Sequence, residues 1–149
     1  MTAPEIRPIT RADRAEWGRL WNGYLTFYQS ELPDSQYELT FNRLLDPQFN
    51  YYGRLAVSEG RAIGLVHWLF HPTGWAERPV CYLQDLYADP QARGKGVGTA
   101  LIDAVAEEAR EAGAENVYWT TQHFNATARS LYDKVATLTP FIKYRKDIR

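Results

Sequence analysis

The chain contains 149 residues, of which 45% are hydrophobic and 23% are charged, and its formal net charge is −1 at pH 7. This balance argues against a protein that mainly coats nucleic acid or an anionic membrane. The single cysteine, Cys81, excludes an internal disulfide and a multi-cysteine zinc site. No apolar run reaches about 18 residues, and the first residues lack a signal-peptide pattern. We therefore expect one cytoplasmic domain over residues 1–149.

The first part of the chain predicts one short strand followed by two helices. Residues 6–9 form the expected strand, and Thr10 is a plausible helix N-cap. A helix should follow, because aromatic and apolar residues recur at spacings of three and four, at positions 17, 20, 21, 24, 27 and 28. A second, short helix carries Phe41, Leu44 and Leu45 and should stop before Asp46-Pro47.

The pattern then changes to strands. Residues 51–58 and 62–70 predict a hairpin, and residues 80–88 form a third apolar run. A helix from about residue 97 to Gly113 should follow, and then a strand over 116–121, a helix over 125–134 and a last strand over 141–146. The expected fold class is therefore α/β (α+β), a mixed sheet with helices packed on both faces.

A glycine-rich segment, residues 91–99, joins the third apolar run to the next helix. The first turn of a helix has N–H groups without intrahelical partners, and the helix dipole adds positive potential there. Glycines allow such a backbone to approach an anion closely, and Arg93 and Lys95 add charge. The segment fits neither the dinucleotide pattern G-x-G-x-x-G nor the Walker loop. It therefore predicts another kind of anion site, or else a plain turn between strand and helix.

Several segments resemble the GNAT superfamily of N-acetyltransferases. Gln91-x-x-Gly94-x-Gly96 looks like the acetyl-CoA loop of that family, and Asn125-x-x-Ala128-x-x-Leu131-Tyr132-x-Lys134 is similar to its second cofactor-binding segment. Residues 139–146 match its last strand, and residues 20–28 resemble a branch near polyamine, diamine and lysine-type acetyltransferases. The resemblance implies a mixed, mostly antiparallel sheet, with acetyl-CoA as the acetyl donor and no metal.

The same resemblance implies which residues bind acetyl-CoA. The backbone of the strand before the loop, at Leu86, Tyr87 and Ala88, would bind the pantetheine arm like an added strand. The pyrophosphate would lie against the loop residues Arg93, Gly94, Lys95, Gly96, Val97, Gly98 and Thr99. The later segment would contribute Asn125, Ala128, Tyr132 and Lys134. An asparagine such as Asn125 is also a favoured helix N-cap, and the two roles are compatible.

The implied reaction is direct attack of an amine on the thioester of acetyl-CoA, without an acyl-enzyme. Tyr132 matches the family's general acid, because its hydroxyl is protonated at neutral pH. A backbone N–H near Leu86 is the candidate donor to the oxyanion. Related enzymes often place a Glu where this chain has Gln84, which cannot ionise. Asp85 follows it, but strand alternation turns Asp85 to the opposite face unless a bulge intervenes.

The acceptor is expected to enter between the N-terminal helices and the strand that contains His67. The expected acceptor contacts are Trp21, Tyr24, Tyr28, Glu31 and His67, although most of the aromatic rings on that helix face can equally be core. The general base stays open among Glu31, His67 and His71, with capture of a free amine as a further alternative.

Two classes of function follow from the sequence. The first is an enzyme whose partners are acetyl-CoA and a primary amine, either a polyamine- or diamine-like small molecule or a lysine. The second is a non-catalytic acyl-CoA sensor, which Gln84 favours and Tyr132 opposes. Neither nucleic acid nor a membrane is expected as a partner, and a homodimer is an option.

Overall fold

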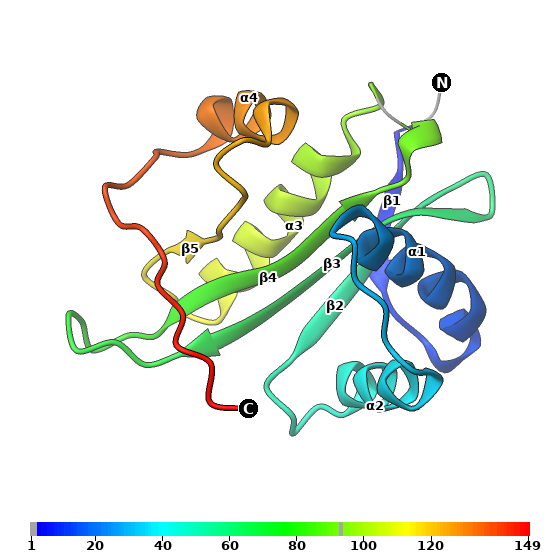
Figure 1. Cartoon of the computed structure of the whole chain (residues 1–149), viewed down its shortest axis with the longest axis horizontal. Coiled ribbons are helices and arrows are strands. Elements are labelled where there is room, and N and C mark those ends of the chain that lie inside the picture. Colours follow the sequence, from blue (N-terminus) through cyan, green and yellow to red (C-terminus); the bar gives the residue numbers. More distant parts are fainter. Residues whose placement is uncertain (1–2, 93) are drawn as a thin grey trace.

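A five-stranded sheet forms the centre of the computed structural model, which describes residues 3–92 and 94–149 (Figure 1). Its strands are β1 (Glu5–Pro8), β2 (Tyr52–Ser58), β3 (Arg61–His71), β4 (Val80–Ala88) and β5 (Val117–Tyr118). The helices are α1 (Arg14–Phe27), α2 (Asp34–Leu45), α3 (Val97–Glu111) and α4 (Ala126–Val135). Short 3-10 turns precede α1 at Arg11–Asp13 and follow β4 at Pro90–Ala92.

The strands lie in the order β1-β2-β3-β4-β5, and the first four are antiparallel to their neighbours. β5 runs parallel to β4, but the two strands pair only at Cys81–Val117 and Tyr82–Tyr118. The expected mixed, mostly antiparallel sheet is therefore confirmed. Along the rest of β4, from Leu83 to Ala88, no strand of the described chain pairs with the edge next to β5.

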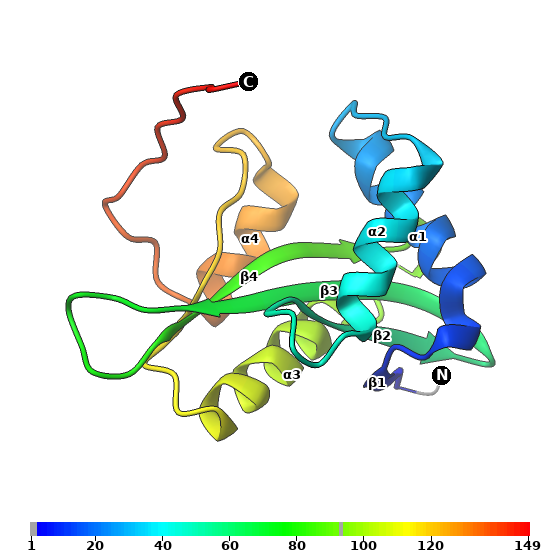
Figure 2. The same ribbon diagram turned by 90° about the horizontal axis from the view of Figure 1, so that it is seen from below.

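Helices cover both faces of the sheet, as expected. Figure 2 shows α1 and α2 on one face and α3 on the other. The core under α1 and α2 is built from large buried side chains, among them Trp17, Leu20, Phe41, Leu55 and Leu65. The core under α3 includes Val66, Leu83, Leu101 and Val105. In each core, the strand side chains that point to one face of the sheet pack against helix side chains spaced three or four residues apart.

The close packing of α3 on β3 depends on Gly64. A Cβ atom at Gly64 would lie 2.7 Å from Val97 Cγ1 and 3.1 Å from Leu101 Cδ1. We expect Gly64→Ala to lower the free energy of unfolding by about 1–3 kcal/mol, the usual cost of forcing an extra methyl into a packed core. Urea denaturation measures the loss, and Gly74→Ala is the control because nothing lies within 4 Å of a Cβ there. Equal stability of the two variants would contradict this account of the packing.

A β-bulge interrupts β4 beside the middle of β3. His67 is opposite Asp85, but the residue after His67 is opposite Leu83, so Gln84 is the extra residue. A bulge shifts the strand alternation by one position. Leu83 before the bulge and Leu86 after it therefore both face the α3 core. Asp85 faces the other side of the sheet, where it meets His67.

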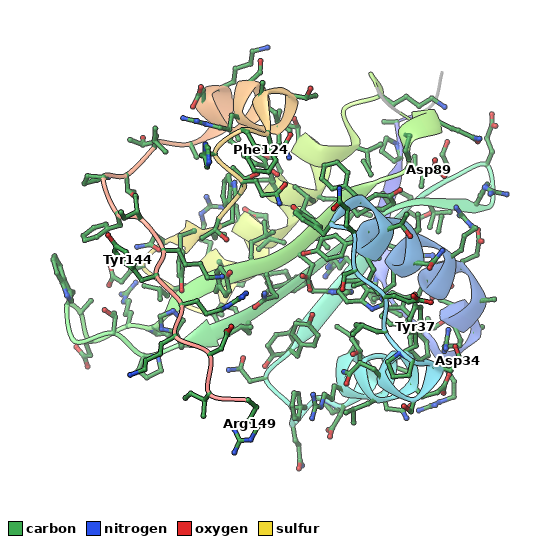
Figure 3. All side chains as sticks on the ribbon, in the orientation of Figure 1. Asp34, Tyr37, Asp89, Phe124, Tyr144 and Arg149 are labelled. Carbon is green, nitrogen blue, oxygen red and sulfur yellow. The ribbon has the colours of Figure 1, made fainter. Side chains whose placement is uncertain are left out.

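The predicted last strand, residues 141–146, is wrong. Residues 137–149, called here the C-terminal tail, contain neither helix nor strand. A strand requires a hydrogen-bonded neighbour, and no described strand pairs with this segment. Its apolar side chains are exposed, and Tyr144 lies at the outer side of the tail with 88% of its surface accessible (Figure 3). The strand predicted over 116–121 is likewise shortened to Val117–Tyr118.

No described helix combines the length and the apolar character needed to cross a membrane.

Candidate active site

A pocket with a volume of ≈ 310 Å³ lies where α1, β4, α4 and the C-terminal tail approach one another. Its walls include Tyr24 and Tyr28 at the end of α1, Gln84 and Leu86 of β4, Tyr132 of α4 and Lys143 of the tail. The segment after β5, residues 119–122, supplies a further wall. The pocket thus borders the unpaired edge of β4 and brings together residues that are far apart in the sequence.

Behind Tyr24 lies a buried hydrogen-bond network, called here the Asp85 network, which consists of Trp17, Tyr24, Tyr51, His67 and Asp85. The Tyr51 hydroxyl donates to Asp85 Oδ2 over 2.6 Å, and His67 Nδ1 lies 2.9 Å from the same oxygen. Trp17 Nε1 donates to His67 Nε2 over 3.1 Å. The Tyr24 side chain also interacts electrostatically with the Asp85 carboxylate. Because Tyr24 lines the pocket, its hydroxyl connects the pocket to a carboxyl group that is only 5% exposed.

The hydrogen bonds of His67 define which of its nitrogens carries the proton. An indole N–H can only donate, so Trp17 Nε1 requires a lone pair on His67 Nε2. The ring proton therefore lies on Nδ1 and is donated to Asp85. His67 is neutral in this arrangement and is 0% exposed. The His67 ring orients the Asp85 carboxylate and does not line the pocket.

The charges of the Asp85 network follow from burial and hydrogen bonding. Burial acts to raise the pKa of Asp85, but the hydrogen bonds from His67 and Tyr51 outweigh it and hold that pKa below its ordinary value. Burial, joined by the neighbouring Asp85 charge, raises the pKa values of Tyr24 and Tyr51 above their ordinary value. At neutral pH the network therefore holds one carboxylate and two protonated tyrosines.

The expected acceptor residues separate into two groups. Tyr24 and Tyr28 line the pocket, whereas Trp21 is 7% exposed and stacks behind Tyr24 with ring centroids 4.8 Å apart. His67 belongs to the buried network. Glu31 is exposed in the segment between α1 and α2 and is not among the residues that line the pocket.

Outside the pocket lies His71, another candidate for the general base. His71 contacts Tyr118 at the other end of β3, with His71 Nε2 2.7 Å from the hydroxyl oxygen.

The residues expected to bind acetyl-CoA follow β4 and the start of α3. Leu86 lines the pocket, and Tyr87 and Ala88 are the last two residues of β4. Gly94 and Gly96 have φ angles of +81° and +73°, a region that favours glycine. Gly96 is the N-cap of α3, so Val97, Gly98 and Thr99 form its first turn, where N–H groups lack intrahelical partners. Lys95 is exposed beside them, and Arg93 lies outside the described residues.

The second predicted cofactor segment is α4 with its cap. The Asn125 side chain accepts a hydrogen bond from the Ala128 backbone N–H over 3.3 Å, which is the N-cap role. Lys134 is exposed on α4. Tyr132 lines the pocket, and its ring meets the edge of Trp119 with centroids 5.4 Å apart. Burial raises the pKa of Tyr132 to about 12, so its hydroxyl keeps its proton at neutral pH.

Two polar residues of the Asp85 network were not found by sequence reasoning. Tyr51 was expected only as the start of a strand, and Trp17 only as part of a helical apolar face. The spacing of the sequence carries no signal for either role, because the contacts depend on the pairing of β2, β3 and β4 and on the bulge. Cys81 is buried, and burial raises its thiol pKa to about 12, which does not favour a nucleophile. Among the described residues, no group of His, Cys, Asp and Glu side chains is suited to hold a metal ion.

Comparison with known proteins gives consistent matches over most of the chain. The sequence profile of the acetyltransferase (GNAT) family matches residues 17–136. The chain is 39% identical over 144 residues to the D-amino-acid N-acetyltransferase of Saccharomyces cerevisiae, a match that covers 95% of this chain and 89% of the yeast protein. It is 38% identical over 69 residues to the thialysine N-epsilon-acetyltransferase of Mus musculus, which covers 46% of this chain and 39% of the mouse protein.

Among solved structures, the fold is similar to that of a ribosomal-protein-alanine N-acetyltransferase from Brucella melitensis biovar Abortus 2308. The TM-score is 0.83 at 22% sequence identity, over 99% of this chain and 100% of the other. At this level of identity the match supports the fold, while the family resemblance and its branch are supported by the sequence matches.

Proposed function

Because the chain belongs to the acetyltransferase (GNAT) family and is an acetyl-CoA-dependent N-acetyltransferase, we propose that it acetylates the primary amine of a small molecule in a direct ternary complex. The observation that carries this proposal is the convergence on one pocket of Tyr132, the bulged strand β4 and Tyr24, whose side chain interacts with Asp85.

In the proposed reaction the amine nitrogen attacks the thioester carbonyl carbon of acetyl-CoA, and the C–S bond then breaks. The unpaired edge of β4 would bind the pantetheine arm as an added strand, with its phosphates at the start of α3. The backbone N–H near Leu86 is the proposed oxyanion donor. Tyr132 gives its proton to the leaving thiolate and regains one from solvent, to which the proton of the amine is finally released. The products are the acetylated amine and free CoA.

The free energy of removing the proton from the amine limits the role that Asp85 can have. A lysine-like ammonium has a pKa of about 10.4, whereas the ordinary Asp pKa is about 3.9, so moving that proton to Asp85 costs roughly 9 kcal/mol or more. Using the free base of the amine at pH 7 costs only roughly 4.6 kcal/mol. We therefore propose that the free amine attacks, and that Tyr24 and Asp85 receive the proton after attack, when the nitrogen bears a positive charge and is much more acidic.

The proposed function is tested by an acceptor panel with acetyl-CoA. Free CoA is measured with a thiol reagent, and the acceptor is checked by mass spectrometry for one added acetyl group. The panel contains a diamine, a polyamine, lysine, D- and L-amino acids and a lysine-containing peptide. We expect CoA release with at least one small amine and not with the peptide. Tight acetyl-CoA binding without release on any acceptor would instead support the sensor.

A further inference from the structure

Lys143 is the only charged side chain among the described residues that line the pocket. Every other lining residue is uncharged at neutral pH, including Tyr24, Tyr28 and Tyr132. No acidic residue of the described chain forms an ion pair with Lys143, although several other basic side chains are paired, such as Arg54 with Glu108. The pocket therefore presents one free ammonium group from the tail, while the Asp85 carboxylate is buried and does not line the pocket.

From this arrangement we infer that Lys143 binds an acidic group on the acceptor, so that the preferred acceptors are amines that carry a carboxylate, such as amino acids. This inference rests on the proposed function. An amino acid would present its amine to Tyr24 and its carboxylate to Lys143, which pairs opposite charges. A polyamine or diamine would instead place a second cation in a pocket that already contains one, and like charges repel. The inference thus disfavours the polyamine- and diamine-like acceptors that the sequence left open.

The position of the tail indicates that Lys143 binds the acceptor and not the phosphates of the cofactor. Lys143 follows α4 in the tail, and the tail crosses the start of β4 (Figure 1). The glycine-rich loop and the start of α3 lie beyond the opposite end of that strand (Figure 1). Lys143 is therefore placed to contact the acceptor rather than the pyrophosphate.

The test compares acids with their amides in charge variants of Lys143. D- and L-alanine and the two alaninamides serve as acceptors, because each pair differs by the carboxylate, and each kcat/KM is expressed per concentration of unprotonated amine. Lys143→Met removes the charge and keeps an unbranched apolar side chain, whereas Lys143→Arg keeps the charge. Lys146→Met is the matched control, since Lys146 lies on the same tail but does not line the pocket. The kcat/KM of each acceptor and the Kd of acetyl-CoA are measured for each variant.

We expect the wild-type enzyme to prefer an acid over its amide. Lys143→Met should lower kcat/KM for the acid about ten- to hundredfold and change that for the amide less than about twofold. Lys143→Arg should retain most of the activity on the acid, and Lys146→Met should match the wild type. A wild-type preference for the amide or for polyamines, an equal loss on acid and amide, or a weaker Kd for acetyl-CoA would each overturn the inference. In all three cases acetyl transfer itself still occurs, so the proposed function fails only if no amine is acetylated.

Discussion

Asp85→Asn is expected to lower kcat/KM for the acceptor amine by about 10²- to 10⁴-fold, the usual contribution of a positioned proton acceptor. The substitution removes the charge and the basicity of the group that we propose receives the amine proton. The fold should persist, because an amide oxygen can accept the bonds from Tyr51 and His67 that now converge on Asp85 Oδ2. Single-turnover acetyl transfer measures the effect, and thermal unfolding followed by circular dichroism verifies the fold.

The pH dependence of kcat/KM distinguishes an Asp85 that receives the proton after attack from a base that titrates near neutral pH. Hydrogen bonding holds the pKa of Asp85 below its ordinary value, so the carboxylate is fully ionised throughout pH 6–9. Burial raises the pKa of Tyr24, so its hydroxyl stays protonated over the same range. Only the acceptor amine then titrates, and kcat/KM should rise about tenfold per pH unit until the pH reaches the pKa of the amine. Asp85→Asn should lower kcat/KM by the same factor at every pH, so that the slope of log kcat/KM against pH is unchanged.

Asp103→Asn is the control for Asp85→Asn, since Asp103 lies on α3 at the other face of the sheet and should retain wild-type activity. Two results would contradict the role of Asp85. One is a folded Asp85→Asn enzyme with kcat/KM within about twofold of the wild type. The other is a wild-type pH profile with an additional inflection near neutrality that Asp85→Asn abolishes, because that would identify Asp85 as a base with a raised pKa.

Much of the fold could be predicted because its helices and strands bury one face each. Spacings of three and four placed α1 and α3, and the hairpin of β2 and β3 followed from two apolar runs around a glycine turn. The predicted last strand failed for a physical reason. Residues 141–146 have strand-like side chains, but strand formation depends on a pairing partner, and sequence pattern does not reveal whether one is available.

The site was less predictable than the fold, because its key geometry is tertiary. The sequence indicated both Gln84 and Asp85 as site candidates, but regular strand alternation predicted that their side chains point to opposite faces of the sheet. A bulge that depends on the pairing of β4 with β3 turns Asp85 toward His67. Tyr51 joins them only because its segment precedes β2, which pairs with β3. Tyr132 was found more easily, because it lies on a helix at a fixed spacing from Asn125.

Tyr132→Phe is expected to lower the single-turnover rate of acetyl transfer about 10²-fold, at the low end of the range for a general acid. The effect should be smaller than that of a typical acid because a thiol with a pKa of about 8.5 is already an acceptable leaving group. The phenyl ring should keep the edge contact with Trp119, so acetyl-CoA should bind within about threefold of the wild-type Kd. Stopped-flow measurement of thiol release and calorimetric titration of acetyl-CoA provide the two values.

The comparison of turnover with acetyl-CoA binding tests the proposal that Tyr132 is a proton donor. Because its pKa is raised to about 12, the hydroxyl remains protonated up to about pH 11, and the wild-type rate should show no alkaline loss from Tyr132 below that pH. Tyr52→Phe is the matched control, since Tyr52 packs against the core under α3 and does not line the pocket. An unchanged rate in Tyr132→Phe would remove Tyr132 from the mechanism. A loss of acetyl-CoA affinity as large as the loss of rate would assign it to cofactor binding alone.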